Sequence, residues 1–122
     1  MIMSKTFLLI GALAGAVGVA LGAFGAHALR GRVSPEMLAV FETGVRYQMY
    51  HALALVALAA LEPRLGGALV ATAGWAFAVG IVLFSGSLYA LALTGTTMFG
   101  IVTPFGGLAF LVGWGALAVA AI

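Results

Sequence analysis

The stretch TFLLIGALAGAVGVALGAFGAHAL, from Thr6 to Leu29, decides the class of fold because it runs for 24 residues without a charged side chain. A membrane-spanning helix needs about 20 consecutive, predominantly apolar residues. Lys5 and Arg30 bound the run at its two ends. We therefore predict a transmembrane helix over about residues 6–29.

A cleaved signal peptide is the alternative interpretation of this run. Lys5 supplies a basic start, and Ala26-His27-Ala28 has the small-x-small form of a cleavage site. The run is longer than a signal-peptide core of about 7–15 residues, so we expect a retained span.

Five glycines recur in the same run at alternating spacings of four and three residues, which places them on one narrow side of a helix. In lipid, helices associate through close backbone approach, which small residues permit. We predict a packing face here, with a glycine-lined pore or ligand groove as the alternative. Its members are Gly11, Gly15, Gly18, Gly22 and Gly25.

The composition of the whole chain agrees with a membrane location. Hydrophobic residues make up 65% and charged residues 7% of the 122 residues, whereas about a quarter of the residues in soluble domains are charged. The net charge of +2 comes from five basic and three acidic side chains, too few for a nucleic-acid surface. The sequence therefore predicts a single-domain, all-α integral membrane protein with no nucleic-acid partner.

Charged positions divide the rest of the chain into three further apolar segments, at about residues 44–61, 65–93 and 104–122. Glu62-Pro63-Arg64 is so short a connection that the second and third spans must form an antiparallel hairpin. We expect Pro63 to end the helix before it. The predicted fold is a bundle of four transmembrane helices.

The longer first connection carries helix-start signals. Ser34 suits an N-cap, Pro35 the first helical position, and Glu36 the positive end of the helix dipole. Three apolar residues then share one face: Met37, Leu38 and Phe41. We predict a short interfacial amphipathic helix over about residues 34–43 that joins the second span at Thr43-Gly44.

The helical rise of about 1.5 Å per residue assigns a depth to each polar residue. We call the face that carries Lys5 and Glu62 side A, and the opposite face side B. On this scale His27 lies at the side B interface and His51 near the bilayer midplane. The polar residues of the second and third spans fall between these two levels, so we predict a polar cluster in one leaflet.

This cluster is the candidate ligand site. Tyr47, Gln48 and His51 lie on one seam of their helix. The leading interpretation is a site that binds or translocates a small molecule or ion, since an intramembrane imidazole is a functional candidate. The alternative is a non-transporting accessory or assembly protein, in which the cluster only ties the helices together. The members are His27, Arg46, Tyr47, Gln48, His51, Ser85, Ser87 and Tyr89.

Arg46 also lies four residues after Glu42, the spacing of a helical ion pair. We expect that interfacial pair, with an arginine that binds an anionic ligand or lipid headgroup as the alternative.

Motifs for enzymes, cofactors and metals are absent from the sequence. There is no cysteine or aspartate, no phosphate loop and no metal signature. A Ser-His-acid triad would need an interfacial glutamate. His27 and His51 lie on different helices, about 14 to 16 Å apart in depth. We predict no enzymatic activity, no cofactor and no metal site.

Four motifs resemble a known family: GAFGAHAL at Gly22 to Leu29, ETGVRYQMYHALAL at Glu42 to Leu55, LFSGSLYALAL at Leu83 to Leu93, and TPFGG at Thr103 to Gly107. In their order and spacing they are similar to the small four-helix proteins grouped as domain of unknown function 423, which is related to the eukaryotic transmembrane protein 256 family. The resemblance covers nearly the whole chain. It implies a multi-pass protein of the bacterial inner membrane with no established activity.

The resemblance also implies an orientation, since longer family members tend to be basic after the fourth helix, which suggests that both termini face the cytoplasm. This chain stops at Ile122 without that tail, and its basic residues occur on both sides. Glycine and alanine are more abundant than one bundle requires, so we expect a homo-oligomer as well as contact with membrane lipid.

Overall fold

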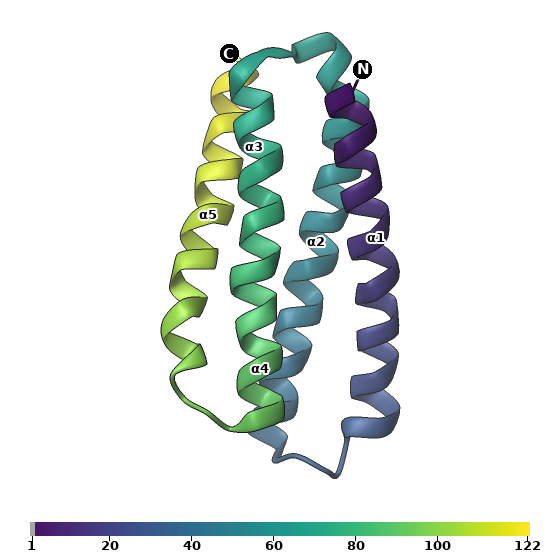
Figure 1. Ribbon diagram of the computed structural model, residues 1–122, viewed down its shortest axis with the longest axis vertical. Helices are drawn as coiled ribbons and strands as arrows, with labels where there is room; N and C mark the ends of the chain where they lie inside the picture. The colour runs from purple at the N-terminus through teal and green to yellow at the C-terminus, as the bar shows by residue number, and fades with distance from the viewer. Residues whose placement is uncertain (1) are drawn as a thin grey trace.

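The computed structural model describes residues 2–122, which form helices and no β-strand. The helices run in the order α1 (Ile2–Phe24), the π-helical turn η1 (Gly25–Leu29), α2 (Pro35–Leu65), α3 (Gly67–Gly80), the π-helical turn η2 (Ile81–Ser85), α4 (Gly86–Thr94) and α5 (Phe99–Ala120). Because α3, η2 and α4 form one continuous rod, the chain makes four antiparallel rods (Figure 1).

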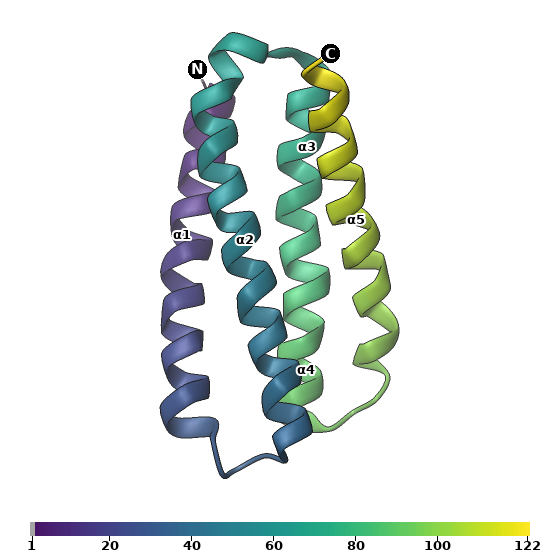
Figure 2. The same ribbon diagram turned by 180° about the vertical axis from the view of Figure 1, so that it is seen from behind.

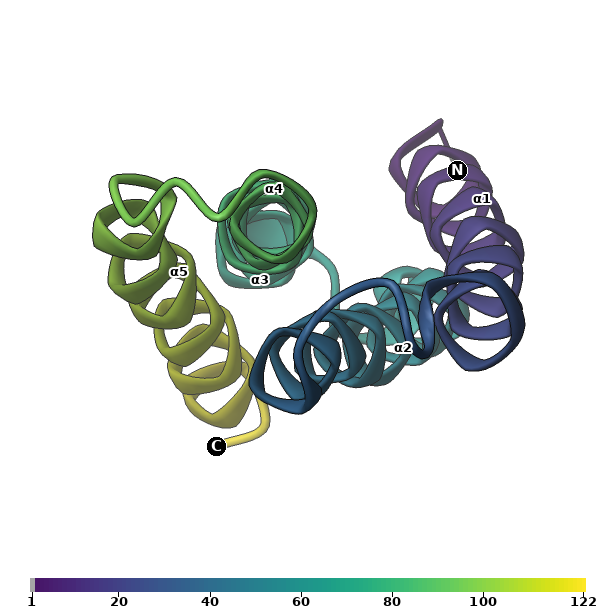
Figure 3. The same ribbon diagram turned by 90° about the horizontal axis from the view of Figure 1, so that it is seen from below.

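Two antiparallel pairs build the bundle. α1 packs along α2, and α5 packs along α3 and η2. α2 joins the pairs through its contacts with α3, η2 and α4, so α1 lies on the outside, far from α5 (Figure 3). The two termini and the α2–α3 turn lie at side A, and the loops of residues 30–34 and 95–98 lie at side B (Figure 2).

Within residues 2–122, three helical segments are long and apolar enough to cross a membrane: Ile2–Leu29, Gly67–Thr94 and Phe99–Ala120. α2 falls outside this set. Its first half carries Glu42, Arg46 and His51, which lower its mean hydropathy.

The glycine stripe of α1 faces α2. At Gly11 an added Cβ would lie 2.9 Å from the Ala52 carbonyl oxygen, so only glycine allows this backbone approach. At Gly15 the added atom would meet nothing within 4 Å. The remaining three lie against side chains of α2: Gly18 on Met49, Gly22 on Val45, and Gly25 on Phe41.

Phenylalanine residues packed on glycines, two through their rings and Phe84 through its backbone, join α3 and η2 to α5. Phe110 of α5 packs on Gly80, whereas Phe84 of η2 packs on Gly106. In the third pair Phe77 of α3 packs on Gly113 of α5, so the phenylalanine again comes from the α3 rod and the glycine from α5. Each step of three or four residues along the α3 rod matches an equal step back along α5, so the register is regular. We call these three pairs the Phe–Gly ladder.

The predicted start of α2 is confirmed, but the predicted boundary within it is wrong. Ser34 is the N-cap, its Oγ accepting from the Met37 N–H at 3.2 Å, and Pro35 is the first helical residue. The helix then continues through Gly44, so residues 34–43 are not a separate interfacial helix. Gly44 makes room for the Tyr89 ring, which packs on it so closely that an added Cβ would lie only 2.7 Å from the ring.

The prediction that Pro63 ends the helix is also wrong. α2 includes Pro63 and runs to Leu65. Gly66, with φ of 56°, ends it, and its N–H donates to the Glu62 carbonyl at 2.7 Å. In the last turn a proline costs one backbone hydrogen bond, which this capping bond offsets.

α5 starts at Phe99 rather than at residue 104, with Pro104 inside the helix. The segment before Pro104 is polar enough to be taken for a loop in the sequence. Its Thr103 side chain is instead satisfied by Ser87 across the α4–α5 interface.

Candidate functional site

Gln48 ties three helices together from its position on α2. Its Nε2 donates to the Ala14 carbonyl of α1 at 2.8 Å, and its Oε1 accepts from the Tyr89 hydroxyl of α4 at 2.6 Å. The side chain is only 4% exposed. Both ends of the amide are therefore used within the bundle.

The two serines of the candidate site make separate contacts between helices. Ser85, fully buried in η2, donates to the Gly44 carbonyl of α2 at 2.6 Å. Ser87 lies on the adjacent face, where its Oγ is 2.6 Å from Thr103 Oγ1 of α5. The serines thus join the α3–α4 rod to both of its neighbours.

His51 is held at both ring nitrogens. Its Nδ1 lies 2.7 Å from the Tyr47 carbonyl oxygen, and its Nε2 lies 3.0 Å from Nε1 of Trp114 on α5. A carbonyl can only accept and an indole N–H can only donate. The proton is therefore on Nδ1, and Nε2 accepts, which is a neutral imidazole.

Aromatic rings enclose this imidazole. It stacks on Phe110 with ring centroids 3.6 Å apart and planes 6° apart, and Phe77 lies at 5.3 Å. His51 is only 4% exposed. An imidazolium would need an acceptor at Nε2, where the Trp114 N–H stands.

The remaining predicted site residues face outward. His27 of η1 and Arg46 of α2 are exposed. Tyr47 is 37% exposed, with its ring against Phe84 at a centroid distance of 4.7 Å. The structure therefore brings Gln48 and His51, with the two serines and Tyr89, into helix interfaces, and leaves His27 and Arg46 outside them.

The prediction of an ion pair between Glu42 and Arg46 is wrong. Glu42 Oε1 lies 4.0 Å from Nη2 of Arg30 instead, linking α2 to the end of the first rod. Arg46 has no ion pair within residues 2–122. The sequence spacing allowed the helical pair, but the antiparallel packing of α1 on α2 supplied a second arginine.

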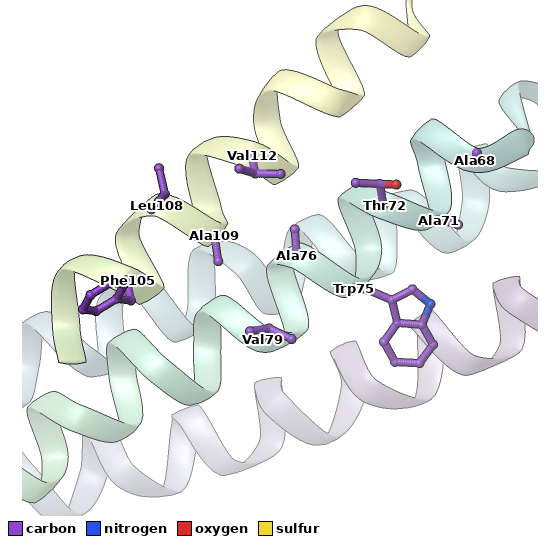
Figure 4. Close-up of a pocket in the computed structure, with 10 residues that line it drawn as sticks. All are labelled: Ala68, Ala71, Thr72, Trp75, Ala76, Val79, Phe105, Leu108, Ala109 and Val112. Carbon is purple, nitrogen blue, oxygen red and sulfur yellow. The ribbon is translucent and has the colours of Figure 1, made fainter.

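The polar cluster is closed rather than hollow. Within residues 2–122 every buried side-chain nitrogen or oxygen atom has a hydrogen-bond partner. A groove of about 730 Å³ lies on the outer surface between α3 and α5 (Figure 4), away from the cluster. It is lined by Ala68, Ala71, Thr72, Trp75, Ala76, Val79, Phe105, Leu108, Ala109 and Val112.

A narrower groove of about 300 Å³ between α1 and α3 includes one cluster member, Gln48, among aliphatic side chains. Neither groove is lined by His51. Residues 2–122 also hold no group of three or more His, Cys, Asp or Glu side chains placed to bind a metal ion.

Sequence reasoning missed Trp114 as the partner of His51 and Ser4 as a tie at side A, where its Oγ donates to Glu62 at 2.7 Å. The signal for Trp114 was its indole N–H, which needs an acceptor when it is buried in a helical bundle. Which residue supplies that acceptor depends on the rotation of α5 about its axis, which spacing along one helix does not give.

The chain is similar to known bacterial membrane proteins. The family model described as "Protein of unknown function (DUF423)" matches residues 21–107. The UPF0382 membrane protein YwdK of Bacillus subtilis is 49% identical over 119 residues, which cover 97% of each chain. This chain belongs to the DUF423 family. The resemblance inferred from the four motifs is thereby confirmed.

Other members of the family show a similar level of identity. The UPF0382 inner membrane protein YgdD of Escherichia coli K12 is 41% identical over 119 residues, covering 98% of this chain and 91% of that protein. A UPF0382 membrane protein of Staphylococcus haemolyticus is 46% identical over 110 residues, covering 90% and 89%. These names state a membrane location and no activity. No solved structure shows a significant match to the chain.

Proposed function

We propose that this family member is a non-transporting accessory or assembly protein of the bacterial inner membrane, whose polar cluster holds its helices in register. The single observation that carries this proposal is the pairing of His51 through both ring nitrogens inside an aromatic enclosure. A carrier site must exchange partners with its cargo and open to one side of the membrane. The paired, enclosed imidazole supports the structural role.

Proton flux into reconstituted vesicles tests this role. We expect vesicles that contain the protein to take up protons no faster than protein-free vesicles, and His51→Gln to behave like the unmodified chain. His27→Gln is the matched control, since it removes the exposed imidazole. A protein-dependent flux that His51→Gln abolishes, while His27→Gln retains it, would establish a translocation role instead.

The rival proposal is a small-molecule or ion site, and one observation favours it. Gln48 lines the α1–α3 groove, and its amide nitrogen has two hydrogens, of which the Ala14 carbonyl takes one. On this proposal the groove admits the ligand, with the exposed Arg46 and His27 contributing from side B. A copurified ligand that is lost in Gln48→Leu would favour it over the structural role.

We further propose that α2 is the fourth transmembrane helix, in a multi-pass protein with both termini in the cytoplasm. Arg46 and Arg64 lie 18 residues apart on α2, about 27 Å along a helix, close to the hydrocarbon thickness of about 30 Å. The exposed residues between them are largely apolar, including Leu53 and Leu61. Arginines at such positions extend their side chains to the two interfaces.

Cysteine accessibility tests this topology, because the chain contains no cysteine. Single cysteines at Arg32 and Pro63 should react with a membrane-impermeant reagent from opposite sides of the membrane, with position 63 reacting from the cytoplasm. Labelling of both positions from the same side would contradict a spanning α2.

We also propose that the protein is a homo-oligomer. The α3–α5 groove is lined by small residues and large exposed apolar ones such as Trp75 and Phe105, which suit close helix contact in lipid. Native mass spectrometry of the protein in nanodiscs would give the number of copies, and a monomer only would rule the proposal out.

A further inference from the structure

A third groove opens between α1 and α2 at side A. It has a volume of about 310 Å³ and runs along the outer surface of the pair. Three of its lining residues come from the first turns of α1 and three from the second half of α2. They are Ser4, Lys5, Leu8, Val56, Ala59 and Ala60.

One cation lines this groove, and a second follows its α2 wall in sequence. Lys5 lines it directly and is exposed. Arg64 lies one helical turn beyond Ala60 on α2, so it extends from the same face of that helix. Neither cation forms an ion pair in the part of the chain that the structure describes.

The acidic residue at this end is bound by Ser4, one of the residues that line the groove. The Glu62 carboxylate accepts a hydrogen bond from Ser4 Oγ at 2.7 Å. Lys5, Glu62 and Arg64 together carry a net charge of +1. The mouth of the groove therefore favours an anion.

Polarity changes with depth along the groove. Leu8 lies about 4.5 Å below Lys5, and Val56 about 12 Å below Arg64, at 1.5 Å per residue. Below the cations the lining consists of leucine, valine and alanine side chains. A cationic rim above an aliphatic floor, with no aromatic ring, matches a headgroup phosphate followed by an acyl chain.

We propose that this groove is a binding site for one anionic phospholipid, with its phosphate between Lys5 and Arg64 and one acyl chain along Leu8, Val56 and the two alanines. The inference rests on the proposed four-span topology, which places the cations at headgroup level. A second copy of the chain fits the site less well. Two of its three acids, Glu36 and Glu42, lie at side B, and the third, Glu62, already accepts a hydrogen bond from Ser4 of its own chain.

Native mass spectrometry of detergent-purified protein, titrated with phosphatidylglycerol or phosphatidylcholine, tests the site. We expect tighter binding of phosphatidylglycerol, and a loss of ~5-fold for Lys5→Gln and for Arg64→Gln, since each cation near a lipid surface contributes about 1 kcal/mol. The double variant should lose ~25-fold. Arg32→Gln is the matched control, because it removes the same charge at side B and should leave the affinity unchanged.

The acyl-chain half of the site needs its own variant. Ala60→Leu fills the groove and should weaken phosphatidylglycerol binding, whereas Ala57→Leu, an exposed position of α2 outside the lining, should not. Glycerol phosphate without acyl chains should not compete. Should Ala60→Leu fail to fold, the two cation variants still decide the question.

Three outcomes would overturn the proposal: equal affinity for the two lipids, an equal loss in Arg32→Gln, or full competition by glycerol phosphate. A copy-number change in the Lys5→Gln protein would assign the groove to a second copy instead. The proton-flux assay is independent of all these results, so the lipid site and the structural role of the polar cluster can fail separately.

Discussion

Gly106→Ala is expected to disrupt the α3–α5 half of the bundle, whereas Gly107→Ala, one residue further along the same helix, should leave it intact. At Gly106 an added Cβ would meet the backbone nitrogen of Phe84 and lie 2.7 Å from its Cα. Backbone atoms cannot rotate aside, so the two helices must separate. Overpacking of this kind costs about 1–3 kcal/mol and occasionally more, and a clash with backbone lies at the upper end.

The neighbouring position is a close control. At Gly107 the nearest atom to an added Cβ is Phe84 Cδ2 at 3.9 Å, an ordinary contact. Both variants add one methyl group to α5, so any general effect on helix propensity is shared. Thermal unfolding in one detergent would compare them, and a Gly106→Ala protein as stable as Gly107→Ala would show that the Phe–Gly ladder is not closely packed.

His51→Ala should lower the free energy of unfolding by about 2 to 4 kcal/mol. It leaves the Trp114 N–H without an acceptor and opens a cavity beside Phe110, and each effect costs free energy. His51→Gln should cost less than half as much, since its longer side chain fills most of the cavity and its amide oxygen can accept from the indole. Hydrogen bonds between transmembrane helices average near 0.6 kcal/mol, so most of the loss in His51→Ala is expected from the cavity.

Equilibrium unfolding in mixed micelles would measure these changes, with His27→Ala as the control for loss of an exposed imidazole. A His51→Ala protein as stable as His27→Ala would contradict the structural role. So would a His51→Gln protein as unstable as His51→Ala, because neither the filled space nor the acceptor would then contribute to stability.

The class of fold and the approximate positions of four helices could be predicted because lipid demands long apolar runs, and the charges interrupt them. The start of α2 followed from Ser34 and Pro35, whose preferences are local. The boundary at Gly44 could not be predicted correctly, since glycine there serves the Tyr89 ring of a distant helix. Local reasoning interprets such a glycine as a helix end.

Much of the α3–α5 packing was present in the sequence as an unnoticed pattern. Phe77, Gly80 and Phe84 are spaced by three and four residues, and Gly106, Phe110 and Gly113 by four and three. Read from Gly113 back to Gly106, the second set has the same spacings as the first, with glycine where the first has phenylalanine and phenylalanine where the first has glycine. An antiparallel pair of helices turns that complementarity into the Phe–Gly ladder.

For the candidate site, the fixed helical rise predicts the depth of Gln48 and His51 along their helix. Depth alone does not say which way each helix is rotated. Spacing along one helix therefore does not identify Trp114 as the partner of His51, nor does it show that Arg46 is exposed while Gln48 and His51 are buried. Those assignments depend on how separate helices face each other.

The most direct test of the structural role is the ¹⁵N NMR spectrum of the His51 imidazole, in bilayers at neutral pH, with His27→Gln leaving a single histidine. The pairing with Tyr47 and Trp114 predicts one neutral tautomer, protonated at Nδ1 and accepting a hydrogen bond at Nε2. A Trp114→Phe variant should shift the Nε2 signal alone. An imidazolium, a ring protonated at Nε2, or exchange between tautomers would contradict the closed, structural cluster.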